Sequence, residues 1–414
     1  MVKKISAYPV YLFMEGALSL AFAMIFTASS VYQVTMAGLT PLQLVLVGTA
    51  LELSVFLFEV PTGVIADIYS RRLSIIIGMF LIGLGFLLEG SIPLFWTILA
   101  AQILWGFGYT FTSGATQAWI TDEIGEARAG RAFLRSNQVG QVASLVGIGL
   151  GMVLGSLRVN IPIQVGGGSI VFLGILLVLI MPETGFKPSP REDRNSWQNM
   201  LHTFREGLST IRRRPSLLTI LSIGFIYGLY SEGLDRLWTK HILDNFAFPT
   251  LIELQPVVWI GLVRAVSMLL SVAAVEVVQR KVDTQSHSSI ARALFFISAI
   301  LIASLFGFAL AGTLALALLF YWIIDVARDV IGPTYTAWVN QRLDSRVRAT
   351  VISMSGQVDA IGQIAGGPVV GLIGNWLSVR AALIASSLIL SPVLVLYRRA
   401  MRQDDSTQFV PGEE

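Results

Sequence analysis

Residues 59–72 read Glu-Val-Pro-Thr-Gly-Val-Ile-Ala-Asp-Ile-Tyr-Ser-Arg-Arg, and this stretch turns an apolar run into a charged connection. One hydrophobic segment begins near Pro41 on its left, and another begins at Leu73 on its right. Runs of roughly 20 apolar residues are long enough to cross a bilayer as a helix. The stretch is therefore predicted to form a tight connection between two membrane spans, built around Gly63, Asp67, Arg71 and Arg72.

The composition is that of a polytopic membrane protein. The chain of 414 residues is 54% hydrophobic and 13% charged, whereas soluble domains carry roughly 25% charged residues. It divides into about twelve apolar runs of spanning length, separated by short charged or Gly/Pro-containing turns. The net charge is only +3 and the basic residues flank the apolar runs, so we expect contact with the lipid bilayer and no binding of nucleic acid.

The residue types needed for metal binding and covalent catalysis are scarce. The chain contains no cysteine, which excludes disulfides, thiolate catalysis and cysteine metal sites. Its three histidines lie far apart in the sequence, at His202, His241 and His287. No nucleophile, metal cluster or phosphate-binding loop stands out. We therefore expect no metal, no cofactor and no enzymatic activity.

The distribution of basic residues predicts the topology. The predicted spans cover residues 10–32, 43–66, 73–92, 94–119, 133–157, 161–181, 216–238, 254–279, 290–311, 313–338, 349–374 and 378–398. Most of the 29 Lys and Arg residues lie at the termini and in the even-numbered connections. Because cytoplasmic loops carry the excess of Lys and Arg, both termini are predicted to be cytoplasmic.

An internal repeat indicates two related halves. Five residues recur at one constant offset: Ala118, Trp119, Ser136, Gln138 and Val139 correspond to Ala337, Trp338, Ser355, Gln357 and Val358. Chance matches between helices of biased composition are the alternative, which the number of spans disfavours. The repeat predicts two parallel six-helix halves with a substrate site between them.

A polar stretch from Pro182 to Pro215 separates the halves. Apolar residues recur within it at spacings of four and three: Trp197, Leu201, Phe204, Leu208 and Ile211. This pattern predicts a basic amphipathic helix that lies on the inner leaflet or packs as a linker. The predicted organisation is an N-terminal bundle over residues 1–181, a cytoplasmic linker over 182–215, a C-terminal bundle over 216–399 and a cytoplasmic tail over 400–414.

The spacing Gly-x-x-x-Asp-x-x-x-Arg-Arg from Gly63 to Arg72 resembles the loop after the second helix of major facilitator superfamily transporters, although Ile68 and Ser70 depart from the usual Arg and Gly. The Pro-Thr-Gly-x-x-Ala-Asp run and the Ala-Trp-x-x-Asp-Glu run at 118–123 look like the bacterial multidrug and macrolide efflux branch. The resemblance implies an all-α integral membrane protein with twelve transmembrane helices in two pseudo-symmetric six-helix halves. It also implies alternating access in a bacterial cytoplasmic (inner) membrane.

The same resemblance gives the opening loop the role of a cytoplasmic gate. A carboxylate lies where the second span ends, and guanidinium groups lie where the third begins. An ion pair between them can tie the two helices in one conformation and break in the other. The alternative is that the two arginines only set the topology. The predicted gate comprises Gly63, Asp67, Arg71 and Arg72.

Carboxylates inside apolar spans are expected to be functional, because a charge at the membrane centre costs roughly 2.5 to 3.5 kcal/mol on insertion scales. Glu52 and Glu59 are seven residues apart and share a helix face that should point inward. Burial favours the protonated form of a carboxylate, which suits a group that exchanges protons. A structural hydrogen bond is the alternative. The proton-coupling candidates are Glu52, Glu59, Asp359, Asp325 and Glu15.

Further charges in the second half are predicted to form a network. It comprises Arg264, Arg328 and Asp329 together with Asp325 and Asp359. Local pairing of Arg328 with its neighbours along one helix is the alternative. Asp359 is specific to the second half, since Gly140 is its repeat counterpart, and Arg264 is its possible partner.

Two further comparisons with the family concern coupling. Many proton-coupled members carry an Arg four residues before the Gly-x-Gly of the fourth span, where this chain has Gln102. Either coupling uses other groups, or the transporter is not proton-driven. The run from Gly147 to Gly155 has glycine at every fourth position and is similar to the antiporter signature of drug exporters, although Met152 replaces its Pro. Close helix packing is the alternative explanation of these glycines.

Three functions follow from these features. The first is export of a lipophilic small molecule or drug by a monomer, with the proton as coupling ion. The second is a proton-coupled uptake symporter for a nutrient such as a sugar or organic acid, which a polar cavity with a basic group would favour. The third is a receptor or scaffold without transport. Residues that could line the cavity, or instead pack between helices, are Tyr32, Gln33, Trp105, Tyr109, Gln138, Tyr227, Trp322 and Gln357.

Overall fold

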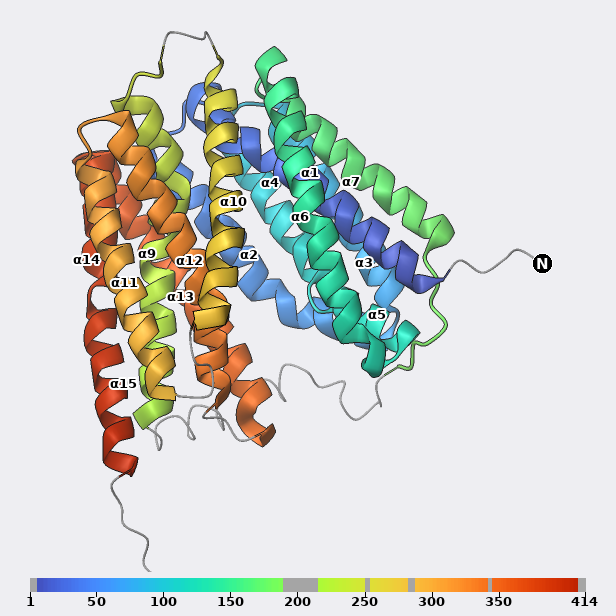
Figure 1. Ribbon diagram of the computed structural model, residues 1–414. Helices are drawn as coiled ribbons and strands as arrows, with labels where there is room; N and C mark the ends of the chain where they lie inside the picture. Colours follow the sequence, from blue (N-terminus) through green and yellow to red (C-terminus); the bar gives the residue numbers. More distant parts are fainter. Residues whose placement is uncertain (1–5, 189–214, 250–253, 282–286, 342–344, 409–414) are drawn as a thin grey trace, which may run out of the picture. The chain divides into compact units, whose positions relative to one another are not determined.

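The computed structural model describes residues 6–188, 215–249, 254–281, 287–341 and 345–408 (Figure 1). All regular secondary structure in these ranges is helical. The amphipathic helix predicted over residues 197–211 lies outside the described residues. The chain divides into two compact units, one formed by Met1–Leu201 with Pro249–Arg264 and the other by His202–Phe248 with Ala265–Glu414.

Among the described residues, seven helices belong to the first unit. They are α1 (Ala7–Thr35), α2 (Pro41–Ile68), α3 (Arg71–Ser91), α4 (Phe95–Thr112), α5 (Ala115–Ile124), α6 (Glu126–Leu157) and α7 (Ile161–Ile180). Helix α1 packs against α6 and α7, and α3 packs between α4 and α7. The side chain of Thr40 caps α2, and Ser70 caps α3, as expected for residues whose oxygen can accept from the first free backbone N–H groups.

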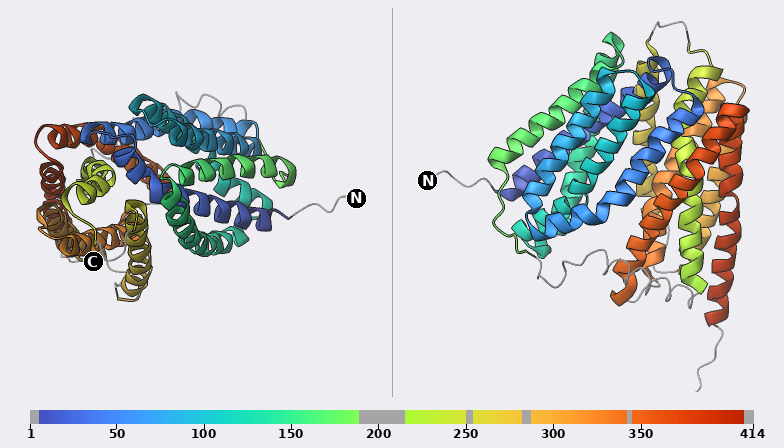
Figure 2. Two further views of the ribbon diagram at one scale, coloured as in Figure 1. Left: turned by 90° about the horizontal axis from the view of Figure 1, so that it is seen from above. Right: turned by 180° about the vertical axis from the view of Figure 1, so that it is seen from behind.

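The second unit contains the remaining helices of the described ranges. They are α9 (Pro215–Asn245), α10 (Pro256–Lys281), whose first residues belong to the first unit, α11 (His287–Leu310), α12 (Leu314–Gln341), α13 (Ser345–Trp376), α14 (Val379–Leu390) and α15 (Pro392–Gln408). Helix α9 packs against α12, α13, α14 and α15. In Figure 2 it is the yellow-green helix inside an arc of orange and red helices.

Glycines allow α9 and α13 to approach closely. A Cβ atom on Gly362 of α13 would lie 2.9 Å from the backbone nitrogen of Leu229 in α9. A Cβ atom on Gly366 would lie 2.7 Å from the Cα of Leu229. Only residues without side chains fit at such distances. This contact fixes the position of α13 against α9, and with it the positions of the polar side chains that the two helices carry.

Nine helices in the described part of the chain are long and apolar enough to span a membrane, with α14 and α15 counted as one. Helices α4, α12 and α13 are not among the nine; α12 carries Asp325, Arg328 and Asp329 within two turns. Buried chemistry is expected in α12, because charged residues inside a membrane helix are costly and are kept for function.

Two of the predicted spans are interrupted. The predicted span 94–119 is divided into α4 and α5 at Gly114, whose φ of 72° lies in the left-handed region that glycine adopts without strain. The predicted span 378–398 is divided at Pro392, which begins α15 and lacks the N–H needed to continue a helix. The sequence predicts both spans as continuous helices, and residue type alone does not locate the breaks, since Pro61, Pro333 and Pro368 lie inside unbroken helices.

Candidate functional site

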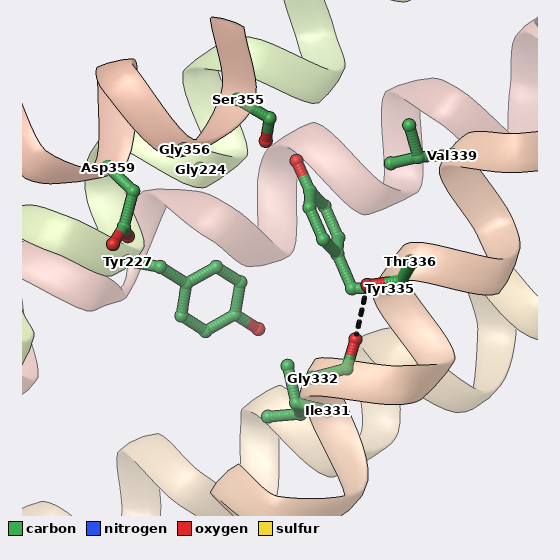
Figure 3. A pocket seen from close by; sticks show the side chains of 10 residues that line it. All are labelled: Gly224, Tyr227, Ile331, Gly332, Tyr335, Thr336, Val339, Ser355, Gly356 and Asp359. Atoms are coloured by element: carbon green, nitrogen blue, oxygen red, sulfur yellow. Dashed lines mark hydrogen bonds between the residues drawn. The ribbon is translucent and has the colours of Figure 1, made fainter. Parts of the chain in front are cut away.

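Two adjoining cavities lie in the second unit between α9, α12 and α13. The larger has a volume of about 350 Å³ and is lined by Gly224, Tyr227, Ile331, Gly332, Tyr335, Thr336, Val339, Ser355, Gly356 and Asp359 (Figure 3). The smaller, of about 210 Å³, is lined by Tyr227, Tyr230, Ser231, Asp235, Arg328, Ile331, Gly332, Asp359 and Gln363. Four residues line both cavities and therefore stand at the junction: Tyr227, Ile331, Gly332 and Asp359.

Asp359 projects from α13 into this junction. Its Oδ2 accepts a hydrogen bond of 2.8 Å from Nε2 of Gln363, one turn further along the helix. The side chain is half-buried, and no described residue forms an ion pair with it. Figure 3 shows its carboxylate on the same side of the cavity as the Tyr227 ring.

The tyrosine hydroxyls are held by the protein. The hydroxyl of Tyr227 is 2.7 Å from Oγ of Ser298, and that of Tyr335 donates to the carbonyl oxygen of Ile220 at 2.7 Å. The two ring centroids are 6.4 Å apart, with an angle of 65° between the planes. These contacts fix the ring orientations and present aromatic surface to the cavity.

An ion pair between α9 and α12 closes the other side of the junction. Arg328 binds both carboxylate oxygens of Asp235, with 2.9 Å between Nη2 and Oδ2. This bidentate geometry is the strongest that an arginine and a carboxylate form. The alternative that the sequence left open is that Arg328 pairs only with neighbours along its own helix. This alternative does not hold, because its partner Asp235 lies on α9. The charges of this pair cancel, so the described cavity lining retains the single unpaired charge of Asp359.

The other charged residues predicted for this network lie apart from the cavity lining. Asp325 accepts a hydrogen bond from Ser267 of α10. Asp329 is exposed on α12. The pairing of Arg264 with Asp359 stays a prediction. Trp322 and Gln357 are half-buried and do not line either cavity.

A buried carboxylate in the first unit was not singled out from the sequence. The side chain of Glu89, near the end of α3, is 0% exposed. Its Oε1 accepts from Ser29 at 3.1 Å and Gln33 at 2.8 Å, and its Oε2 accepts from Gln102 at 2.8 Å. The hydroxyl of Tyr32 donates to the Glu89 carbonyl oxygen at 2.7 Å. We call these five residues the Glu89 cluster.

The cluster changes the interpretation of three residues named from the sequence. Tyr32 and Gln33 are buried against Glu89. Gln102, which stands where many proton-coupled relatives carry Arg, supplies an amide to the same carboxylate. Glu89 lies two residues before the end of α3, a position that suggests a solvated helix end when only the sequence is known. Glu89 is buried because residues of α1 and α4 pack around it, and the sequence next to Glu89 does not predict that packing.

The remaining residues named from the sequence occupy varied environments. Trp105 packs in an aromatic group with Phe22, Phe26 and Phe86. Tyr109 is 44% exposed. Gln138 is exposed and accepts from Arg135 at 3.0 Å. The carboxylates of Glu15, Glu52 and Glu59 belong to half-buried residues on α1 and α2.

The α2–α3 connection contains ion pairs formed by Arg71. Arg71 lies 3.5 Å from Asp67 and also pairs with Asp122 of α5. Arg72 instead donates to the carbonyl oxygen of Val178 in α7. Gly63 lies one turn before Asp67, with open space where a Cβ would be. The connection is therefore tied to α5 as well as to α7.

The segment that follows α7, residues 182–186, is held against this connection. Glu183 accepts from Oγ of Ser70 at 2.7 Å and from the backbone N–H of Arg72 at 2.9 Å. Glu123 of α5 accepts from both the hydroxyl and the N–H of Thr184. Nε1 of Trp119 donates to the carbonyl oxygen of Pro182 at 2.7 Å. Glu183, Glu123 and Trp119 thus hold the segment after α7 against α3 and α5.

Substitution of Glu183 by alanine is expected to release this fastening. The change removes two hydrogen bonds at the start of α3, which should destabilise the segment by about 1 to 2 kcal/mol. Limited proteolysis in membranes should then cleave faster within residues 182–188. Glu276→Ala, which removes an exposed carboxylate paired only along its own helix, should leave that rate unchanged. An unaltered rate in Glu183→Ala would contradict the structural role assigned to Glu183.

In the described part of the chain, no group of three or more His, Asp or Glu side chains is placed to hold a metal ion. What the structure offers is a helical membrane protein with a partly enclosed cavity that contains one unpaired charge. That combination is expected of a membrane transporter. A family model confirms it: residues 11–366 match the Major Facilitator Superfamily. The chain belongs to this superfamily and is a multi-pass membrane transporter, not an enzyme.

Similar proteins agree with this assignment. The chain is 24% identical over 379 residues to the uncharacterized MFS-type transporter YxaM of Bacillus subtilis (strain 168), covering 90% of this chain and 91% of YxaM. Among solved structures, the nucleoside transporter NupG matches with a TM-score of 0.74 at 13% identity, over 96% of this chain and 98% of NupG. A bacterial homolog of the human lysosomal transporter Spinster matches with a TM-score of 0.76 at 13% identity, over 96% and 97% of the two chains. The predicted all-α major facilitator fold is therefore confirmed.

Proposed function

We propose that the protein exports a lipophilic small molecule by proton antiport with alternating access, as a monomer in a bacterial cytoplasmic membrane with both termini cytoplasmic. The observation that supports this most directly is the position of Asp359. It is a carboxylate outside any described ion pair, in a cavity otherwise lined by tyrosines, small residues and aliphatic side chains.

The chemistry of this lining suits such a substrate. Ligand sites are mostly apolar and aromatic, with few polar groups that fix orientation, and Tyr227, Tyr335, Ile331 and Val339 supply the apolar part. Asp359 can hold either a proton or the polar end of a substrate. If the two compete for one carboxylate, binding of one promotes release of the other, which is the requirement for antiport.

Asp359 is the preferred proton-coupling residue among the sequence candidates, because it lines both cavities whereas Glu15, Glu52, Glu59 and Asp325 line neither. The ties of Arg71 to Asp67 and Asp122 act in this proposal as a gate that holds one conformation of the cycle. Uptake of an acidic nutrient ranks second, since the one basic residue of the described lining, Arg328, is already bound to Asp235 at both oxygens.

Transport direction and coupling can be tested together in membrane vesicles. In everted vesicles with an acidic interior, a panel of hydrophobic dyes and drugs should accumulate, and addition of a transported compound should release protons from the lumen. An uncoupler should abolish both effects. Vesicles from cells that lack the protein are the control. Accumulation confined to right-side-out vesicles would instead assign the protein as an uptake symporter, and proton release without accumulation would contradict antiport.

A further inference from the structure

We propose that the junction between the two cavities of the second unit binds an organic ammonium ion, with the Asp359 carboxylate as its counter-ion. This inference rests on the proposed function in that it names the substrate class for the same site. It is carried by three independent features of the described lining, which are its charge, its aromatic surface and its size.

The charge balance calls for a cation. The described lining of the two cavities contains three charged residues, and two of them, Asp235 and Arg328, satisfy each other through both carboxylate oxygens. Asp359 receives one hydrogen bond from a neutral amide, Gln363. A carboxylate offers about four acceptor positions, so most of its capacity faces the cavity. An anion within a membrane helix is costly unless it is paired, and a bound cation removes that cost.

The Asp235–Arg328 pair also selects against the opposite charge. An anionic substrate would need the guanidinium of Arg328, which is engaged by Asp235 on the neighbouring helix. It would also approach Asp359 and be repelled. A cation can bind Asp359 while the Asp235–Arg328 ion pair stays intact. The site therefore selects for cations by attraction and against anions by repulsion.

The tyrosine rings provide the second feature. Cations bind favourably over the faces of aromatic rings. Tyr227 has its hydroxyl engaged by Ser298, and Tyr335 by Ile220, so neither ring can turn freely. Tyr227 lines both cavities beside Asp359 (Figure 3). A positively charged nitrogen at Asp359 is therefore placed where an aromatic ring can also contact it.

The size of the larger cavity gives the third feature. Its volume of about 350 Å³ is at the small end of the range for ligand sites, which is roughly 300 to 1,000 Å³. Apart from Asp359 and the two tyrosines, the wall consists of Ile331, Val339 and glycines, together with Thr336 and Ser355. The ligand that fits is a compact molecule with one cationic nitrogen and an aromatic or aliphatic body.

A pair of isosteric probes tests the charge requirement. Phenyltrimethylammonium carries a permanent positive charge, and tert-butylbenzene has the same shape with carbon in place of nitrogen. Binding of each to the purified full-length protein in detergent is measured by displacement of a fluorescent aryl ammonium dye. The wild-type protein should bind the ammonium probe at least about tenfold more tightly than its neutral isostere, because only the former pairs with a carboxylate. This comparison requires no variant. Equal affinity for the two probes would overturn the proposal.

Variants then assign the effect to Asp359. Asp359→Asn should remove the preference for the charged probe, while Asp359→Glu, which keeps the charge, should retain most of it. Asp244→Asn is the matched control, because Asp244 is exposed on α9 and pairs only with Lys240; it should bind both probes like the wild type. A preference that survives in correctly folded Asp359→Asn would overturn the assignment to this residue.

Failure of this inference can be distinguished from failure of the proposed function. Suppose that everted vesicles accumulate neutral compounds, while the purified protein shows no preference for the ammonium probe. That outcome would support export and contradict the cation site. Ammonium binding that depends on Asp359, combined with uptake instead of export, would retain the site and reverse the proposed direction of transport.

Discussion

Replacement of Glu89 by alanine is expected to lower the free energy of unfolding by about 3 kcal/mol or more. The carboxylate accepts hydrogen bonds from Ser29, Gln33 and Gln102, all of which are buried. Its removal leaves three buried donors without this acceptor, and each buried group left unsatisfied costs roughly 1 to 3 kcal/mol. The apolar interior of the bundle provides little water to replace the lost acceptor.

The measurement is chemical unfolding in mixed micelles, supported by the midpoint of thermal aggregation in detergent. Glu89→Gln should fall between wild type and Glu89→Ala, because the amide retains one acceptor oxygen but brings an NH₂ group towards existing donors. Glu126→Ala is the control, since Glu126 lies exposed in the first turn of α6. If Glu89→Ala unfolds at the same point as this control, the Glu89 cluster does not stabilise the first unit.

The second large effect is expected for Gly366→Ala, which should abolish or reduce transport by more than about tenfold. The new Cβ would lie 2.7 Å from Cα of Leu229 and closer still to the carbonyl oxygen of the same residue. Main-chain atoms of a helix cannot change position as a flexible side chain can. To accommodate the new Cβ, α9 and α13 must therefore move apart. Because α9 carries Tyr227 and α13 carries Asp359, the cavity that they line is distorted with them.

Transport in vesicles and the melting temperature of the purified protein measure the two consequences. Gly168→Ala in α7 is the matched control, because a Cβ there meets nothing within 4 Å; it should transport and melt like the wild type. A Gly366→Ala protein with wild-type activity would mean that the close contact between α9 and α13 does not determine the geometry of the cavity.

Much of the fold was predictable from the sequence, because bilayer thickness sets the length of an apolar run that spans it. The all-α membrane fold and the superfamily were both predicted correctly. The two interrupted spans show the limit of that reasoning. Hydrophobic length alone runs through Gly114 and Pro392, and the structure divides the helices at those residues because their backbone chemistry prevails over local apolarity.

The site was predictable only in part. Asp359 and Tyr227 were named as single residues, because polar groups in apolar helices attract attention. Arg328 was named as well, but its pairing with Asp235 on α9 was not predicted, since Asp235 lies 93 positions earlier in the chain. Glu89 and Glu183 were missed for a related reason. Both lie at a helix end or in a connection, where a carboxylate is expected to be solvated.

The charged connection from Glu59 to Arg72 therefore determined, by its sequence alone, the class of the protein and the position of a turn between two spans. The sequence of this stretch could not determine which groups it would contact. Only the tertiary structure brought Asp122 to Arg71 and Glu183 to Ser70, and only it enclosed Glu89 and left Asp359 facing a cavity. The physical reason is that span length and charge placement are local properties of the chain, whereas the fate of a buried charge depends on the donors that distant helices bring to it.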